Sequence, residues 1–392
     1  MDFTRLTSFL HHLVDEVRIP SVCMRVYRDG EQVYSHAYGS PEGMTVTPDT
    51  TYNLYSVSKV ITCTAALQLL EQGKYLLTDP LYDYFPQFRE MYVRCGKGDD
   101  LGNRIAQGER ILYEDGKTEA VRATRPILIR DLFNMSAGFS YNYNAPSFKR
   151  ILAETGGKFP TLRLADALAA EPLEYEPGTR WGYSLGHDLI GALIEHLSGM
   201  PFGEYLQKNI FDPLDMKSFT FHRDEAVYET MAPQYLYNYE TKRPELITKE
   251  NPMLIGEGFE SGGAGLIGSV ADYAKFANAM CLGGTSPQGA RILSPATINL
   301  MRQNFLPDGA EADFNWPQLQ GYGYGLGVRT HICPAKGGGL SPIGEFGWGG
   351  AAGAYVMIDP ENRLAAFYGQ HMRNNLEPYV HPRLRNTIYG CL

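Results

Sequence analysis

Apolar and charged side chains alternate at helical spacing over the first twenty residues. Six apolar positions recur with charged residues between them, namely Phe3, Leu6, Phe9, Leu10, Leu13 and Val14. This spacing predicts an amphipathic helix. The next segment, SVCMRVYRDGEQVYSHAYG (21–39), predicts two strands joined at Asp29-Gly30, because that residue pair favours a tight hairpin turn.

A second helical pattern begins near residue 60. Apolar side chains recur at Ile61, Ala65, Leu69 and Leu70 before Gly73, and a glycine after the last periodic residue is a common helix stop. Three later segments carry a helical pattern too: RPILIRDLFNMSAGF (125–139), TLRLADALAAEPL (161–173) and LGHDLIGALIEHLSG (185–199). The middle of the chain is therefore expected to be mainly helical.

The pattern of apolar and polar residues changes again at Gly262. A glycine-rich stretch leads into a helical pattern over 262–284. Three short strand-like runs follow: YGYGLGVRTHI (322–332), EFGWGGAAGAYVMIDPE (345–361) and RLAAFYGQHM (363–372). One more helix is expected at the end, in PRLRNTIYGCL (382–392). Strands at both ends of the chain around a helical middle predict an α/β (α+β) fold with one sheet built from both termini.

The expected architecture is an antiparallel sheet domain flanked by helices, with a mainly helical inserted domain. Residues 1–80 and 262–392 form the sheet domain, and residues 81–261 form the insert. The polar segment RILYEDGKTEAVRA (110–123) carries Asp115-Gly116 near its centre, which predicts an exposed hairpin near 105–123 within the insert.

Composition and charge exclude several classes of function. The chain has 392 residues, 44% of them hydrophobic, and a net charge of −9. Without a run of Lys and Arg, nucleic-acid binding is not expected. No eighteen apolar residues follow one another, so no membrane span is expected, and the amphipathic start does not resemble a signal peptide. These features favour a cytoplasmic protein.

The cysteines and histidines do not suggest a metal or another cofactor. The six cysteines are scattered without a C-x-x-C pair, and the nine histidines form no H-E-x-x-H motif. Scattered cysteines in a chain without a leader are typical of reduced thiols. We therefore expect neither a metal nor a cofactor, and the sequence does not indicate an oligomeric state.

A serine stands three residues ahead of a lysine in NLYSVSKVITCTAALQLLEQG (53–73), and Ser56-Val57-Ser58-Lys59 is the one S-x-x-K match in the chain. Ser56 lies where a strand-like segment meets a helix, so unpaired N–H groups and the helix dipole would stabilise negative charge. Lys59 shares its helix face, and burial would lower the pKa of its amine so that it accepts the serine proton. The alternative is a helix-capping serine and a solvated lysine.

The chain lacks G-x-S-x-G, so a serine hydrolase here would be of the Ser/Lys type. Such a site needs a second proton relay and a glycine-rich strand edge. Tyr183 follows a Pro-Gly turn and precedes a helix, and a tyrosine beside an ammonium group can carry protons. Trp348-Gly349-Gly350 precedes an apolar strand, where the N–H of Ala351 can face a carbonyl oxygen. Ordinary core packing and a simple turn are the alternatives.

This ordered set resembles the serine β-lactamase and penicillin-recognising superfamily, and most closely the branch of class C β-lactamases and family VIII carboxylesterases. LIRDLFNMSAGF, YEPGTRWGYS, SGGAGLIGSVADYAKF and GYGYGLGV add to the similarity. The resemblance implies that Ser56 is the acylated nucleophile, Lys59 its activating partner and Tyr183 the general base and acid. It also implies an oxyanion hole formed by the backbone N–H groups of Ser56 and Ala351.

Two positions depart from the β-lactamase pattern. Leu185 stands where those enzymes have an asparagine, and Trp348 stands where they have a lysine. Both changes delete polar partners of a penicillin or a D-Ala-D-Ala peptide, and a buried polar group left unpaired costs about 1–3 kcal/mol. An ester without those groups loses nothing.

The expected function is therefore cleavage of carboxylic esters with short acyl or aromatic groups through a Ser56 acyl-enzyme. Trp348, Gly349, Gly350, Leu185 and Tyr141 are the expected substrate-binding residues, in an apolar, aromatic pocket. The expected partner is a small-molecule ester or amide. A β-lactamase, a D-amino-acid peptidase, an acyltransferase or a non-catalytic binding module on this fold stay open as alternatives. His187 and His371 are candidates for supporting the site residues, and a structural role is expected for each.

Overall fold

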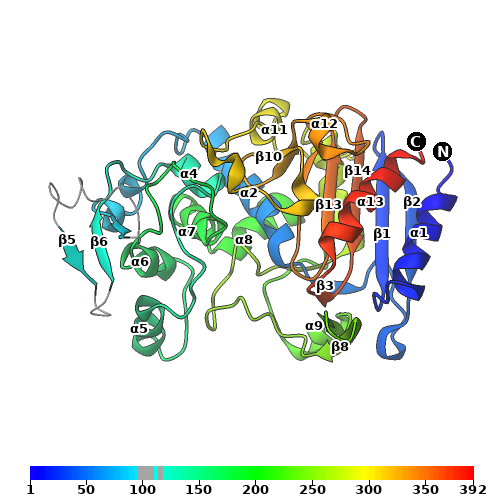
Figure 1. Ribbon diagram of the computed structural model, residues 1–392, viewed down its shortest axis with the longest axis horizontal. Coiled ribbons are helices and arrows are strands. Elements are labelled where there is room, and N and C mark those ends of the chain that lie inside the picture. Colours follow the sequence, from blue (N-terminus) through cyan, green and yellow to red (C-terminus); the bar gives the residue numbers. More distant parts are fainter. Residues whose placement is uncertain (96–109, 114–117) are drawn as a thin grey trace.

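One antiparallel sheet joins the two ends of the chain. The computed structural model describes residues 1–95, 110–113 and 118–392. The strands lie in the order β10-β11-β12-β13-β14-β1-β2 (Figure 1), with these bounds: β10 Tyr322–Tyr324, β11 Arg329–His331, β12 Phe346–Gly349, β13 Tyr355–Asp359, β14 Leu364–Gly369, β1 Val22–Arg28 and β2 Glu31–Tyr38. The pairing of β1 with β14, with Cys23 opposite Gly369, joins the N-terminal hairpin to the C-terminal strands. The expected antiparallel sheet from both termini is confirmed.

The predicted hairpin turn between β1 and β2 is present. Asp29 has φ 53° and Gly30 has φ 89°, and two consecutive residues with positive φ are what the favoured hairpin turn requires. A register shift between Val26 and Tyr27 marks a bulge in the same hairpin.

Helices cover both faces of the sheet. Helix α1 (Thr4–Asp15) contacts α13 (Glu377–Tyr389) and β2, whereas α10 (Val270–Cys281) packs against β14, β1 and β13. Figure 1 draws α1 and α13 on the same side of the strands. The side chains of Leu6, Leu10 and Leu13 are fully buried, as the helical spacing predicts.

Outside this sheet, the described residues form further helices, long connecting segments and three small sheets. Helix α2 (Ser58–Glu71) packs against α7 (Gly186–Ser198). The other helices are α4 Ile129–Phe133, α5 Pro146–Glu154, α6 Arg163–Ala169, α8 Phe202–Leu206, α9 Glu225–Thr230, α11 Pro295–Met301 and α12 Pro334–Gly337. The small sheets pair β3 (Thr51–Asn53) with β9 (Ile267–Ser269), β7 (Gln234–Asn238) with β8 (Arg243–Ile247) and β15 (Met372–Arg373), and β6 (Glu119–Arg122) with β4 (Tyr92–Arg94) and β5 (Arg110–Leu112).

The hairpin expected near 105–123 is described in part. Strands β5 and β6 pair antiparallel, with Arg110 opposite Val121. The turn at Asp115-Gly116 lies outside the described residues. The division of the chain into domains at residues 80 and 262 stays a prediction.

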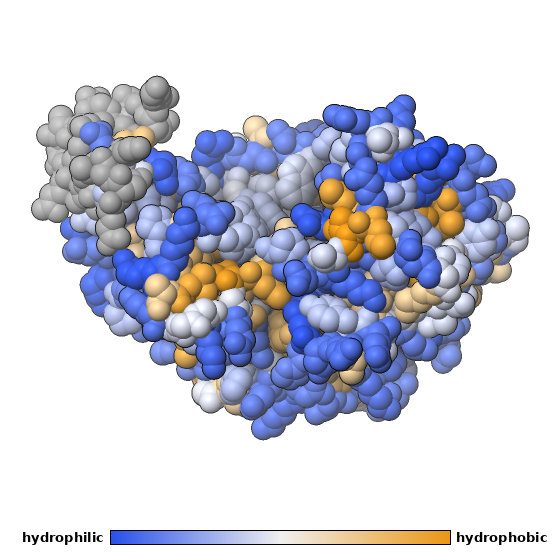
Figure 2. All heavy atoms as spheres, turned by 90° about the horizontal axis from the view of Figure 1, so that it is seen from below, coloured by the Kyte–Doolittle hydropathy of each residue, from blue (hydrophilic) through white to orange (hydrophobic). Residues whose placement is uncertain are grey.

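One face of the molecular surface is drawn by hydropathy in Figure 2. The face drawn in Figure 2 is mostly hydrophilic, and its apolar side chains gather in separate patches. Within the described parts of the chain, no helix is long and apolar enough to span a membrane.

Candidate active site

Ser56 lies in a short turn, Tyr55–Val57, directly before helix α2. Tyr55 adopts φ 49°, a left-handed conformation that is costly for a residue with a side chain. Its side chain is fully buried, and its hydroxyl donates to Gln234 Oε1 at 2.7 Å. These contacts hold the turn that presents Ser56 to a cavity.

Lys59 is fully buried one helical turn further on. Its Nζ donates to Ser56 Oγ at 3.2 Å and to the Gly263 carbonyl oxygen at 2.6 Å. A third contact reaches the Tyr141 hydroxyl at 3.4 Å. Because the amine is buried and aimed at the serine, Lys59 is not a solvated surface charge.

The pKa of Lys59 differs from the sequence-based expectation. Burial lowers this pKa, but the phenol oxygens of Tyr141 and Tyr183 and the carboxyl group of Asp188 outweigh burial and raise it above its usual value. The expectation of a lowered pKa considered burial alone and is wrong. Lys59 is therefore an ammonium group that donates to Ser56 Oγ.

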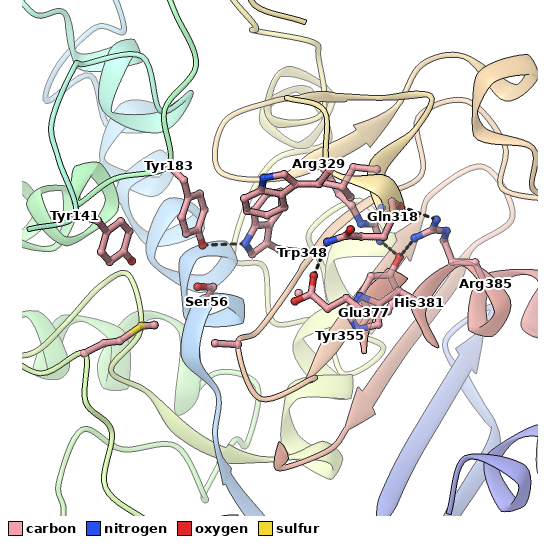
Figure 3. Close-up of a pocket in the computed structure, with 15 residues that line it drawn as sticks. Ser56, Tyr141, Tyr183, Gln318, Arg329, Trp348, Tyr355, Glu377, His381 and Arg385 are labelled. Carbon is pink, nitrogen blue, oxygen red and sulfur yellow. Dashed lines mark hydrogen bonds between the residues drawn. The ribbon is translucent and has the colours of Figure 1, made fainter. Parts of the chain in front are cut away.

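Tyr183 lies in the segment that leads into α7 and faces Lys59. The centre of its ring is 4.7 Å from Lys59 Nζ. The residue before it lies close against Tyr175, since a Cβ at Gly182 would lie 2.5 Å from the Tyr175 hydroxyl oxygen. Trp348 Nε1 donates to the Tyr183 hydroxyl oxygen at 3.1 Å (Figure 3).

Tyr141 joins this group rather than only lining a substrate pocket. Its ring stacks on that of Tyr183, with centres 5.7 Å apart and planes at 11°. Burial raises the pKa of the Tyr141 phenol far above its usual value, so it is neutral and accepts the hydrogen bond from Lys59.

The glycine pair after Trp348 brings the end of β12 against the turn before α2. A Cβ at Gly350 would lie 2.4 Å from the Leu54 carbonyl oxygen, which explains why this position has no side chain. Gly350 N–H donates to the Ala354 carbonyl oxygen at 2.7 Å. Gly349 and Ala351 line the same cavity as Ser56. The part of Ala351 in an oxyanion hole stays a prediction.

Leu185 is a correction to the expected substrate-binding set. Its side chain is fully buried, belongs to the hydrophobic core and does not line the cavity. The residue stands directly before α7, and packing of that helix start against the core turns its side chain away from the cavity.

The cavity in front of Ser56 has a volume of about 260 Å³. Its apolar walls include Tyr183, Trp348, Trp316 and Leu319. The other end of the cavity is polar, and it was not identified from the sequence. It is lined by Gln318, Arg329, Tyr355, Glu377, His381 and Arg385 (Figure 3). No motif marks these residues, because separate segments bring them together.

His187 and His371 each contact a backbone carbonyl oxygen, and their structural role stays a prediction. His187 Nε2 lies 2.9 Å from the Phe133 carbonyl oxygen, and His371 Nδ1 lies 2.9 Å from that of Ala232. Burial lowers the pKa of His187 to about 3 and that of His371 to about 4. Among the described residues, no three His, Cys, Asp or Glu side chains are grouped to hold a metal ion.

Comparison with known proteins agrees with this geometry. Residues 6–378 match the family described as Beta-lactamase. The chain belongs to this family. The lovastatin esterase of Penicillium rubens is 27% identical over 361 residues, which cover 86% of this chain and 84% of that enzyme. Esterase EstB of Burkholderia gladioli is 24% identical over 393 residues, which cover 91% and 86%.

A solved structure shares the Beta-lactamase fold. EstCE1, described as a hydrolase with promiscuous acyltransferase activity, superposes with a TM-score of 0.76 at 24% identity and covers 98% of both chains. The resemblance and the fold expected from the motifs are confirmed. This is a serine hydrolase family with esterase and acyltransferase members.

Proposed function

We propose that the protein is a carboxylesterase that acts through an acyl-enzyme on Ser56. The observation that carries the proposal is the contact of the buried Lys59 ammonium with Ser56 Oγ at 3.2 Å, beside the Tyr183 ring. The two named esterase relatives support the same class of substrate.

In the first step, Ser56 Oγ attacks the ester carbonyl carbon while its proton passes to the oxygen of Tyr183, the general base. The Lys59 ammonium and the Trp348 N–H stabilise negative charge on this oxygen. The backbone N–H groups of Ser56 and Ala351 receive the carbonyl oxyanion. Tyr183 then protonates the leaving alcohol oxygen as its bond to carbon breaks, and the acyl group stays on Ser56.

In the second step, a water molecule gives a proton to Tyr183, and the water oxygen attacks the acyl carbon. Tyr183 returns the proton to Ser56 Oγ as the carboxylic acid leaves. An alcohol in place of water would complete an acyl transfer by the same steps, which is how a hydrolase such as EstCE1 could also transfer acyl groups. Water is the acceptor in our proposal.

The nature of the cavity favours simple esters over β-lactams. Trp348 occupies the place of a lysine whose charge would meet a substrate carboxylate, and its Nε1–H is already used by Tyr183. Among the described residues, the walls formed by Tyr183, Trp348, Trp316 and Leu319 carry no charge to meet a penicillin carboxylate, and the charged groups lie at the polar end of the cavity.

The test is turnover of p-nitrophenyl butyrate and of a penicillin, with intact mass after short incubation. We expect rapid ester turnover, an added butyryl mass on the wild type, and neither in Ser56→Ala. Penicillin turnover at a comparable rate would contradict the substrate assignment. Absence of any acyl-enzyme and of turnover with both reagents would contradict the catalytic proposal.

A further inference from the structure

Glu377 places a carboxylate in the cavity in front of Ser56, and no Lys or Arg of the described residues pairs with it. The residue begins helix α13 and lines the cavity together with Ser56. Its Oε2 accepts from Gln318 Nε2 at 2.6 Å and its Oε1 accepts from Asn375 Nδ2 at 2.9 Å. In Figure 3 its side chain extends from α13 toward Ser56. Both donors are neutral amides, so they orient the carboxylate and leave its charge unbalanced.

An unbalanced carboxylate in a cavity is costly unless a cation joins it. Burial raises the pKa of Glu377, and the hydrogen bonds from Asn375 and Gln318 oppose that rise. Among the described residues, no Lys or Arg nitrogen pairs with this carboxylate within 4.0 Å. A bound ammonium group would stabilise the charged form and recover the cost of burial.

Aromatic residues line the same cavity as this carboxylate. The ring centres of Trp316 lie 5.9 Å from Trp348 and 5.5 Å from Tyr183, and Tyr183 stacks on Trp348 at 5.8 Å. All three residues line the cavity. Aromatic rings attract cations, so a cavity lined by aromatic residues and one carboxylate suits an ammonium group.

The other charges of the polar end are largely satisfied. Arg329 Nη1 pairs with Glu345 at 2.9 Å and 3.0 Å, and burial lowers the pKa of His381 to about 3, so it is neutral. Arg385 donates to the Tyr355 hydroxyl at 2.8 Å and to the Gln318 carbonyl oxygen at 3.2 Å. Arg385 is the one group in the described cavity that would favour an anionic substrate instead.

We propose that Glu377 and the aromatic walls form a subsite for a protonated or quaternary ammonium group carried by the substrate. The natural substrate class would then be esters whose alcohol part bears such a cation. This inference rests on the proposed esterase function and names the substrates on which it acts.

Three butyrate esters with the same acyl group test the subsite. They are butyrylcholine, its uncharged carbon isostere 3,3-dimethylbutyl butyrate, and the anionic 4-(butyryloxy)butanoate. Since all three form the same acyl-enzyme, differences in kcat/KM report the alcohol part alone. We expect kcat/KM for butyrylcholine to exceed that for the uncharged isostere by about tenfold, as for one desolvated cation contact.

Variants identify the group responsible. In Glu377→Gln the ratio of the cationic to the uncharged ester should fall to near one, whereas Glu240→Gln, which removes an exposed carboxylate elsewhere, should keep the wild-type ratio. Equal kcat/KM for the cationic and uncharged esters in the wild type would overturn the subsite and leave the esterase proposal standing. A preference for the anionic ester would overturn it in favour of Arg385. Failure with all three esters and with p-nitrophenyl butyrate would instead overturn the esterase proposal.

Discussion

The ammonium group of Lys59 connects Ser56, through the backbone of Gly263, to the buried carboxyl group of Asp188. Its Nζ donates to the Gly263 carbonyl oxygen, and the Gly263 N–H donates to Asp188 Oδ1 at 3.0 Å. Asp188 is fully buried and its Oδ2 has no hydrogen-bond partner. The sequence predicts the Ser56–Lys59 contact from spacing alone, but the charge of Lys59 depends on phenols and a carboxyl group from distant segments. Residue spacing therefore predicts that Ser56 and Lys59 are in contact, but it does not predict the protonation state of Lys59.

Trp348 acts on Tyr183 through its ring nitrogen rather than only through its apolar surface. We expect Trp348→Phe to lower kcat by about 10- to 100-fold with little change in KM, because a hydrogen bond to a charged oxygen contributes about 1.5–3 kcal/mol. The measurement is steady-state kinetics with p-nitrophenyl butyrate.

Trp316→Phe is the matched control for this exchange. The Trp316 ring packs edge-on against Tyr183 and tilted against Trp348, but the donor to the Tyr183 oxygen is Trp348 Nε1. Its exchange should therefore change KM more than kcat. Similar losses of kcat in both variants would show that bulk, and not the donated N–H, is what Trp348 supplies.

At the scale of elements, periodicity and turn residues predict most of the helices and strands that frame the site. The Asp29-Gly30 turn, the strands 355–359 and 364–369 and the helix ending before Gly73 are all where the patterns indicate. The last helix begins earlier than expected, at Glu377, and contains Pro382 within it. A proline favours a helix start, which is why the sequence placed the beginning there.

The β7–β8 hairpin was not predicted, although it supports the nucleophile. Gln234 of β7 receives the Tyr55 hydroxyl, and β7 pairs with β15 of the C-terminal segment. The positions of this hairpin are mostly half-buried or exposed, so they lack the strict alternation that marks a strand. Its role follows from tertiary contacts that a local pattern does not contain.

The glycines after β12 act through the close approach of two elements. In Gly350→Ala the new Cβ would meet the Leu54 carbonyl oxygen at 2.4 Å and push Ala351 away from Ser56. We expect kcat to fall by about 100-fold, the usual loss for one oxyanion donor, with a smaller loss of stability of about 1–3 kcal/mol from overpacking. In Gly349→Ala the nearest atom is His381 Cε1 at 3.1 Å, so the loss of kcat should be smaller. An equal or larger loss in Gly349→Ala would contradict this account. Steady-state kinetics and thermal unfolding of both variants provide the comparison.

At the scale of the whole molecule, the catalytic end of the site and its polar end have different origins in the sequence. Ser56, Tyr183 and Trp348 lie in short motifs that can be recognised along the chain. Gln318, Glu377 and Arg385 become neighbours only because α13 packs beside the segment around residue 318. A pattern search finds the first group, and only the fold reveals the second.

The buried histidines make the whole molecule sensitive to acid. Burial lowers the pKa of His371 to about 4, while an unfolded histidine has a pKa of about 6.5. Between these values the unfolded chain binds one more proton per histidine, so stability is lost as the pH falls from about 6.5 to about 4.

This contribution can be isolated with one variant. The slope from His371 is about 1.4 kcal/mol per pH unit within that window. The slope of the free energy of unfolding against pH, from urea titrations between pH 4.5 and 6.5, should therefore be about that much smaller in His371→Asn than in the wild type. Glu377 and Asp188, whose pKa values are raised, contribute with the opposite sign, and they do so equally in both proteins. His222→Asn, the same exchange at an exposed position, should leave the slope unchanged. An unchanged slope in His371→Asn would mean that His371 takes up its proton in the folded protein as readily as in the unfolded chain.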